Sequence, residues 1–258
     1  MAKPSPTDRT LIAGRHPVRE ALDREPEHIE RVYLQQGGRG LGILRRAARE
    51  SGVPVQDVPA QRLTKVAGQV RHQGAVAFRT PLPLYTLESM LAAVAPTLDS
   101  VRKDKPLLLV LDRIENPRNF GALVRTAVAA GVSGVLISAR RMAPLSAVMI
   151  KASAGSATRV PIARSEDLTS ALEQLKERGY WVLGATAEAG TSAWDVDWKR
   201  PTALVMGSET AGLEHRITQA CDTLVSIPMP GDAESLNVSV AAGILLFAAV
   251  RDRQPPNC

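Results

Sequence analysis

Short apolar runs alternate with helical patterns over the last two thirds of the chain. The runs that suit buried strands are Leu107–Leu111 and residues 135–137, 180–183, 203–206 and 224–227. Near-continuous apolar runs of this kind are typical of a parallel sheet covered on both faces. A helix predicted between two of them starts at Ser165, has Glu166 and Asp167 in its first turn, and stops at Gly179. The β-α-β-α order predicts an α/β fold with an open, doubly wound sheet.

The first third of the chain gives shorter signals of both kinds. Its predicted helices and strands cover residues 16–24, 41–51, 29–34, 53–58 and 75–78. Gly52 is a natural stop for the second helix. We therefore expect a small α/β domain over residues 10–80, preceded by a disordered tail of residues 1–9.

A proline-rich stretch separates the two regions. Residues 81–105 read as a linker with one helix, Leu87–Val94, and the larger domain then spans residues 106–258. Its last helix, expected from residue 236 to residue 250, is apolar on nearly every face. Such a helix belongs in a core or in a subunit interface.

Composition adds few constraints. The 258 residues are 45% hydrophobic and 22% charged, which is ordinary for a globular protein. No apolar run has the length needed to cross a membrane, and the start of the chain does not resemble a secretory signal. Cys221 and Cys258 have no metal or redox spacing. These features predict a cytoplasmic protein without a membrane partner.

Charge is distributed unevenly. Residues 1–79 carry 14 Lys and Arg against 8 Asp and Glu, whereas residues 80–258 carry 18 of each. A basic domain joined to a neutral one suggests that the basic domain binds a polyanion, although a solvated basic surface is the simpler alternative. With only 3% aromatic residues, phosphate contacts should dominate over base stacking. The candidate RNA contacts are Arg15, Arg39, Arg45, Arg71 and His72.

Several common sites are not supported. The four histidines are scattered, with no H-E-x-x-H, and we predict no metal site. There is no P-loop and no G-x-G-x-x-G, so nothing favours a nucleotide or dinucleotide site of the standard types.

Three motifs in the larger domain carry the functional signal. N-x-G-x-x-x-R runs from Asn119 to Arg125, G-x-E-x-x-G-L begins at Gly207, and S-L-N-V-S-V-A begins at Ser235. In this order they resemble the motifs of the SpoU (TrmH-like) family of RNA ribose 2′-O-methyltransferases. Residues 12–22 and 72–74 look like the substrate-binding domain of a subgroup that methylates a guanosine of 23S rRNA.

The resemblance implies a SPOUT domain with a C-terminal trefoil knot, a homodimer, and S-adenosylmethionine as methyl donor without a metal. The residues it implies for donor binding are Gly207, Ile227, Met229, Ser235 and Leu236. Those it implies for catalysis are Asn119, Arg125, Glu209 and Asn237. Without the resemblance, each has a simpler reading: a turn glycine, core residues, helix N-caps, or an acid that compensates a helix dipole.

Arg125 is the main catalytic candidate. As a lone cation on an otherwise small and apolar helix that begins near Asn119, it either reaches solvent or points into a site, and the resemblance favours the site. A guanidinium has no acceptor lone pair, so it cannot itself take a proton from the ribose hydroxyl. We therefore hypothesise that Arg125 grips the adjacent RNA phosphate and stabilises a developing alkoxide.

Three alternatives remain at this stage. The substrate is a tRNA or an antibiotic-site rRNA nucleotide; the protein is a non-catalytic RNA-binding relative; or it is a dinucleotide-dependent enzyme. The intact Arg125, Glu209 and Asn237 speak against the second, and the missing glycine fingerprint against the third.

Overall fold

The chain forms two compact units. The computed structural model describes all residues except 1–9, 69, 81, 233 and 255–258, so the predicted disordered tail lies outside the described residues. One unit extends to Leu84 and includes Pro144–Ala147, and the other contains the rest of the chain. Of the helices described, none has the length and apolar character needed to cross a bilayer.

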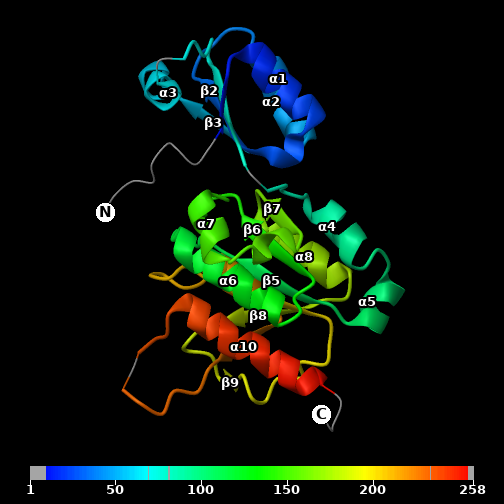
Figure 1. Cartoon of the computed structure of the whole chain (residues 1–258). Helices are drawn as coiled ribbons and strands as arrows, with labels where there is room; N and C mark the ends of the chain where they lie inside the picture. Colours follow the sequence, from blue (N-terminus) through cyan, green and yellow to red (C-terminus); the bar gives the residue numbers. More distant parts are fainter. Residues whose placement is uncertain (1–9, 69, 81, 233, 255–258) are drawn as a thin grey trace. The chain divides into compact units, whose positions relative to one another are not determined.

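The N-terminal unit is built on a sheet of strand order β1-β4-β2-β3 (Figure 1). Its strands are β1 (Thr10–Ala13), β2 (Ile29–Gln35), β3 (Val55–Val58) and β4 (Ala75–Arg79). Its helices are α1 (Arg15–Arg24), η2 (Pro26–His28), α2 (Gly42–Glu50) and α3 (Ala60–Ala67). Ala75 and Ala77 of β4 pack with α1 and α2, whereas Val76 packs with α3. Helices therefore cover both faces of the sheet, as the two-residue period of a strand allows.

Most of the predicted N-terminal elements are present. The strand predicted over residues 53–58 begins only at Val55, because Pro54 has no N–H to give to a ladder. The sequence did not predict β1, which has four residues, or α3. Helix α3 has no side-chain cap and contains the β-branched Thr64 and Val66, so it gave neither a start signal nor strong helix propensity.

The C-terminal unit contains a parallel sheet of order β7-β6-β5-β10-β8-β11-β9. Its strands are β5 (Leu107–Leu111), β6 (Gly134–Ser138), β7 (Ile162–Ser165), β8 (Trp181–Ala185), β9 (Thr191–Ser192), β10 (Thr202–Met206) and β11 (Thr223–Ser226). The predicted α/β fold with a parallel sheet is confirmed. The sequence missed β7, which ends in Arg164 and Ser165, and β9, which has two residues.

Helices cover both faces of this sheet as well. They are α4 (Leu87–Val94), α5 (Leu98–Asp104), α6 (Pro117–Ala129), α7 (Ala147–Ala152), η3 (Ser156–Thr158), α8 (Leu168–Glu177), α9 (His215–Ala220) and α10 (Val238–Arg253). Side chains of α4, α5, α8 and α9 share one core with the sheet. Helices α6 and α10 pack against each other in front of the sheet in Figure 1.

The starts of α8 and α6 differ from the sequence prediction. Helix α8 begins at Leu168, and Asp167 is its N-cap because its carboxylate accepts from the Thr169 and Ser170 amides. Helix α6 begins at Pro117 with Asn116 as N-cap, so Asn119 lies inside the helix. Proline suits the first helical position, where its missing N–H costs nothing.

The segment expected as a linker, residues 81–105, contains α4 and α5, of which only the first was predicted. Thr97 caps α5 through a reciprocal bond with Ser100. The domain boundaries drawn from the sequence stay predictions.

Helix α10 is only partly buried in the single chain. Its residues Leu245 and Leu246 lie in the core, whereas Val240 and Phe247 are each 50% exposed. One face of the helix therefore remains uncovered by the chain's own residues.

Candidate active site

A cavity of about 600 Å³ opens at the carboxyl ends of β8, β10 and β11. Its walls come from residues 185–188, from 206–213, and from 225–229 with the start of α10. Ligands in open α/β sheets bind at this end of the strands, where loops diverge. Cavities between about 300 and 1,000 Å³ are typical of small-molecule sites.

Gly207 has a structural reason to be glycine. A Cβ at this position would overlap the backbone of Gly212 and Leu213. Ser208 and Gly212 exchange two backbone hydrogen bonds of 3.0 Å, which fold residues 208–212 back onto the end of β10. Gly212 itself adopts a φ of +61°. The close approach makes a compact loop whose backbone lines the cavity.

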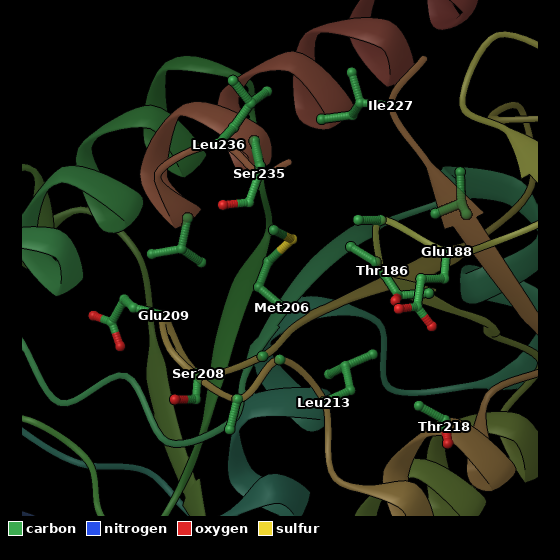
Figure 2. A pocket seen from close by; sticks show the side chains of 18 of the residues that line it. Thr186, Glu188, Met206, Ser208, Glu209, Leu213, Thr218, Ile227, Ser235 and Leu236 are labelled. Carbon is green, nitrogen blue, oxygen red and sulfur yellow. The ribbon is translucent and has the colours of Figure 1, made fainter. Parts of the chain in front are cut away.

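The predicted donor-binding residues gather around this cavity. All five line it: Gly207, Ile227, Met229, Ser235 and Leu236. Figure 2 places Ser235 and Leu236 on one side of the cavity and Ser208 and Leu213 on the opposite side, with Met206 between them. Their contacts with a methyl donor stay a prediction.

Three of the four predicted catalytic residues form a hydrogen-bonded chain. Asn119 donates from Nδ2 to Glu209 Oε1 over 3.1 Å, and Asn237 donates from Nδ2 to Asn119 Oδ1 over 3.4 Å. Asn237 is also the N-cap of α10, since its Oδ1 accepts from the Ser239 amide. Each member comes from a different motif, so the fold joins segments that are up to 118 residues apart. Only Glu209 also lines the cavity.

Arg125 is not part of this chain. It lies six residues after Asn119 on α6, about 9 Å further along the helix axis, and its side chain is exposed. It does not line the cavity. Among the residues described, no hydrogen bond or ion pair is recorded for its guanidinium. The guanidinium is therefore open to an external anion, and the catalytic role of Arg125 stays a prediction.

Comparison with known families decides the relationship. A sequence model of the SpoU rRNA methylase family matches residues 106–247, and a model described as RNA 2′-O ribose methyltransferase substrate binding matches residues 11–85. The chain belongs to the SpoU family. The first model covers the three motifs, and the second covers residues 12–22 and 72–74.

Similar proteins agree with this membership. The chain is 38% identical over 247 residues to a protein of Xanthomonas axonopodis pv. citri named 23S rRNA (guanosine-2′-O-)-methyltransferase RlmB, covering 94% of this chain and 96% of the relative. It is 40% identical to an uncharacterized tRNA/rRNA methyltransferase of Mycolicibacterium paratuberculosis, covering 94% and 77%. The crystal structure of an AdoMet-bound rRNA methyltransferase from Sinorhizobium meliloti aligns with a TM-score of 0.58 at 26% identity, covering 96% and 89%.

Sequence reasoning missed part of the SpoU cavity wall. Figure 2 shows Thr186 and Glu188, from the segment after β8, and Thr218 from α9. These residues belong to none of the three motifs. Thr186 and Glu188 follow a predicted strand, and Thr218 lies shortly before another. The rule that ligands bind at the carboxyl ends of parallel strands was the available signal.

Among the described residues that line the SpoU cavity there is no cysteine. Within the described part of the chain, no three His, Cys, Asp or Glu side chains gather as a metal site requires. Cys221 is a free thiol, and burial raises its pKa to about 12.

Several RNA-contact candidates lie on neighbouring loops of the N-terminal unit. Arg15 Nε donates to the Gln73 carbonyl over 3.0 Å, which joins the start of α1 to the 71–74 loop. A Cβ on Gly40 would lie 3.0 Å from Arg15 Nη1, so the glycine loop of Arg39 is adjacent as well. Arg15, Arg39 and Arg71 are all exposed.

The other two candidates are already engaged. The His72 ring accepts from the Gly74 amide at Nδ1 and bonds Thr64 Oγ1 through Nε2, so it holds the 72–74 loop in shape. Arg45 forms two bonds of 2.6 and 2.7 Å to Asp57, which hold the pKa of that carboxyl below its usual range. Binding of phosphate by Arg45 would have to compete with this pair.

Proposed function

We propose that the chain transfers a methyl group from S-adenosylmethionine to a ribose 2′-hydroxyl of RNA, with a guanosine of 23S rRNA as the substrate. The observation that carries the proposal is the hydrogen-bonded chain Asn237–Asn119–Glu209 at the rim of the cavity. The substrate assignment rests on the printed names of relatives that match over nearly the whole chain.

The cavity fits a methyl donor with an adenosyl group. Ile227, Met229 and Leu236 offer apolar walls, and the 207–213 loop offers backbone groups at close range because Gly207 has no side chain. The donor supplies a sulfonium-bound methyl for direct transfer to an oxygen. Holding donor and acceptor in line accounts for much of the acceleration in reactions of this type.

The acceptor side is assigned to the hydrogen-bonded chain and Arg125. The Asn119 amide, itself held by Asn237, donates to the Glu209 carboxylate at the rim of the cavity, where the carboxylate can orient the nucleotide. Arg125 grips the RNA phosphate next to the target ribose and stabilises negative charge on the 2′-oxygen. The proton leaves to phosphate or water, because a guanidinium cannot accept it.

The N-terminal unit is assigned to RNA binding, as its family match implies. Arg15, Arg39 and Arg71 supply exposed cations from the start of α1 and from two loops beside it. Contacts of this type set register on the RNA without reading its bases. They should make binding strongly dependent on salt.

A C-terminal trefoil knot and a homodimer complete the proposal. The knot rests on membership of the SpoU family. The exposed Val240 and Phe247 on α10 support a subunit contact. A cytoplasmic location stays a prediction.

The test is methyl transfer from labelled S-adenosylmethionine to unmodified total RNA, with the labelled nucleotide mapped. We expect one 2′-O-methylguanosine in 23S rRNA, and loss of transfer with Arg125→Ala. Arg125→Lys keeps the charge but loses the bidentate fork, so it should also fall well below the wild type. Label in tRNA would overturn the substrate. Absence of donor binding would favour a non-catalytic RNA-binding protein.

A further inference from the structure

A cluster of three charged side chains, two of them buried, lies beside the 207–213 loop, outside the cavity lining and outside the three motifs. Asp112 is 4% exposed and Arg113 8% exposed, and both follow directly after β5. Glu214, at the far end of the loop, completes the cluster through an ion pair of 3.3 Å with Arg113. The proposed reaction assigns no role to these three charges.

The backbone at Arg113 is unusual. Its φ is +55°, in the left-handed region that favours glycine over residues with a side chain. Its amide donates to Ser138 Oγ over 3.0 Å, and the preceding Asp112 amide donates to the Met206 carbonyl over 2.9 Å. The residue is therefore anchored to β6 and to β10 before its side chain is considered.

The Arg113 guanidinium points at the loop from this anchored position. Nε donates to Asp112 Oδ2 over 2.9 Å, Nη2 donates to the Gly212 carbonyl over 3.1 Å, and Nη1 pairs with Glu214. The Gly212 carbonyl also accepts the Ser208 amide that closes the loop. One buried side chain thus fixes the point where the loop folds back.

We propose that Arg113 is a positioning residue for the 207–213 loop. It holds residues 208–212 in the folded-back conformation, so that the cavity wall and Glu209 keep their positions. This inference rests on the proposed function. Glu209 lies inside the closed loop and accepts from Asn119, so the Arg113 guanidinium acts on the hydrogen-bonded chain through the loop backbone.

Burying the Asp112–Arg113 pair costs free energy compared with apolar side chains of similar size. A role in fixing one conformation of the loop therefore explains the pair better than a contribution to stability does. Burial raises the pKa of the Asp112 carboxyl, and the bond to Arg113 opposes that rise. Arg216 offers a comparison, because it pairs with the other oxygen of Glu214 at 2.8 Å but is 52% exposed and leaves the Gly212 carbonyl untouched.

Two variants of Arg113 distinguish the effect of its side chain from the effect of its backbone conformation. Arg113→Lys keeps a charge beside Asp112 but cannot reach three partners at once. Arg113→Gly removes the side chain at a φ that glycine adopts readily, so the backbone can stay in place. Arg216→Gln is the matched control. Donor affinity is measured by calorimetry with S-adenosylmethionine, RNA affinity by filter binding, and loop closure by hydrogen exchange at the Ser208 and Gly212 amides.

We expect both Arg113 variants to weaken donor binding about 10- to 100-fold, as for loss of hydrogen bonds from a charged donor. Exchange at the Ser208 and Gly212 amides should become faster in both variants, while RNA affinity stays close to that of the wild type and of Arg216→Gln. Arg113→Lys keeps a charge beside Asp112 and should hold the unfolding midpoint near that of the wild type, whereas Arg113→Gly leaves this buried carboxylate unpaired and should lower the midpoint. For Arg113→Lys, unchanged donor affinity and exchange would overturn the inference, as would a joint loss of both affinities and stability. A wild-type protein that binds no donor would instead overturn the proposed function.

Discussion

The side chain of Asn237 is bonded at both of its polar atoms. Its Oδ1 accepts from the Ser239 amide and caps α10, while its Nδ2 donates to Asn119 in the chain that reaches Glu209. From sequence alone, a cap and a catalytic position looked like competing interpretations of this residue. The structure makes them compatible, because capping uses the oxygen and leaves the amide nitrogen for the site.

Replacement of Asn237 by alanine should therefore have two separable effects. Loss of the cap should lower the free energy of unfolding by about 1 kcal/mol. Methyl transfer should fall by at least about tenfold, because Asn119 loses the partner that orients it toward Glu209. Asp167→Ala, which removes the cap of α8, is the control for the first effect. If both variants lose stability and neither loses activity, Asn237 is only a cap.

Cys221 gives a prediction about reactivity. Burial raises the pKa of its thiol to about 12, so the folded chain holds far less thiolate at pH 8 than the unfolded chain. In a Cys258→Ser background, alkylation by iodoacetamide at pH 8 should be at least about tenfold slower in the folded protein than in urea. Stability should also fall as pH rises from about 9 toward 12, because only the unfolded chain releases the proton in that range. Equal alkylation rates in the folded protein and in urea would contradict the raised pKa of the Cys221 thiol.

At the scale of elements, long apolar patterns were predictable and short or polar ones were not. The Leu107–Leu111 run identified β5, since a strand buried on both faces has an unmistakable composition. Strand β7 was missed because it ends in Arg164 and Ser165, and the start of α6 was misplaced because Asn116 and Asn119 are equally good caps by residue type. The motifs singled out Asn119 and Glu209 as candidates, but only tertiary contacts bring these two residues together.

The end of α10 offers a test at this scale. Arg253 donates to the carbonyls of Trp198, Arg200 and Lys105 over 2.7, 2.7 and 2.8 Å, tying the last helix to segments before β5 and β10. Burial lowers the pKa of this guanidinium, which indicates that the carbonyls replace only part of its lost hydration.

Arg253→Ala should reduce the free energy of unfolding by about 2–3 kcal/mol, since three carbonyls lose a charged donor. Arg251→Ala removes a mostly exposed arginine two residues earlier, which pairs with Asp252, and should change it by less than about 0.5 kcal/mol. Both values come from urea unfolding followed by circular dichroism. Equal effects of the two substitutions would remove Arg253 from its assigned role as an anchor.

At the scale of the whole molecule, charge and chemistry are divided between the units. The excess positive charge lies in residues 1–79, whereas the cavity and the hydrogen-bonded chain lie in the second unit. A neutral unit offers little electrostatic affinity for RNA, and the proposed RNA contacts of the basic unit would supply it. The division also explains why the sequence suggested a polyanion before any motif was considered.

The uncovered face of α10 leads to the last prediction. Val240 and Phe247 are seven residues apart, so they lie on one stripe of the helix, and each is 50% exposed in the single chain. Exposed apolar side chains that recur on one face mark contact surfaces, whereas isolated ones are ordinary.

We therefore expect Phe247→Asp to convert a dimer into a monomer in sedimentation experiments, because a buried unpaired carboxylate in the contact would be costly. Ile43→Asp, on α2 and 67% exposed, places the same charge on an isolated surface position and should leave the dimer intact. A wild-type protein that sediments as a monomer at every concentration would rule out the contact. In that case the apolar stripe of α10 would have to be explained by another occupant, and a single chain would have to supply every residue of the active site.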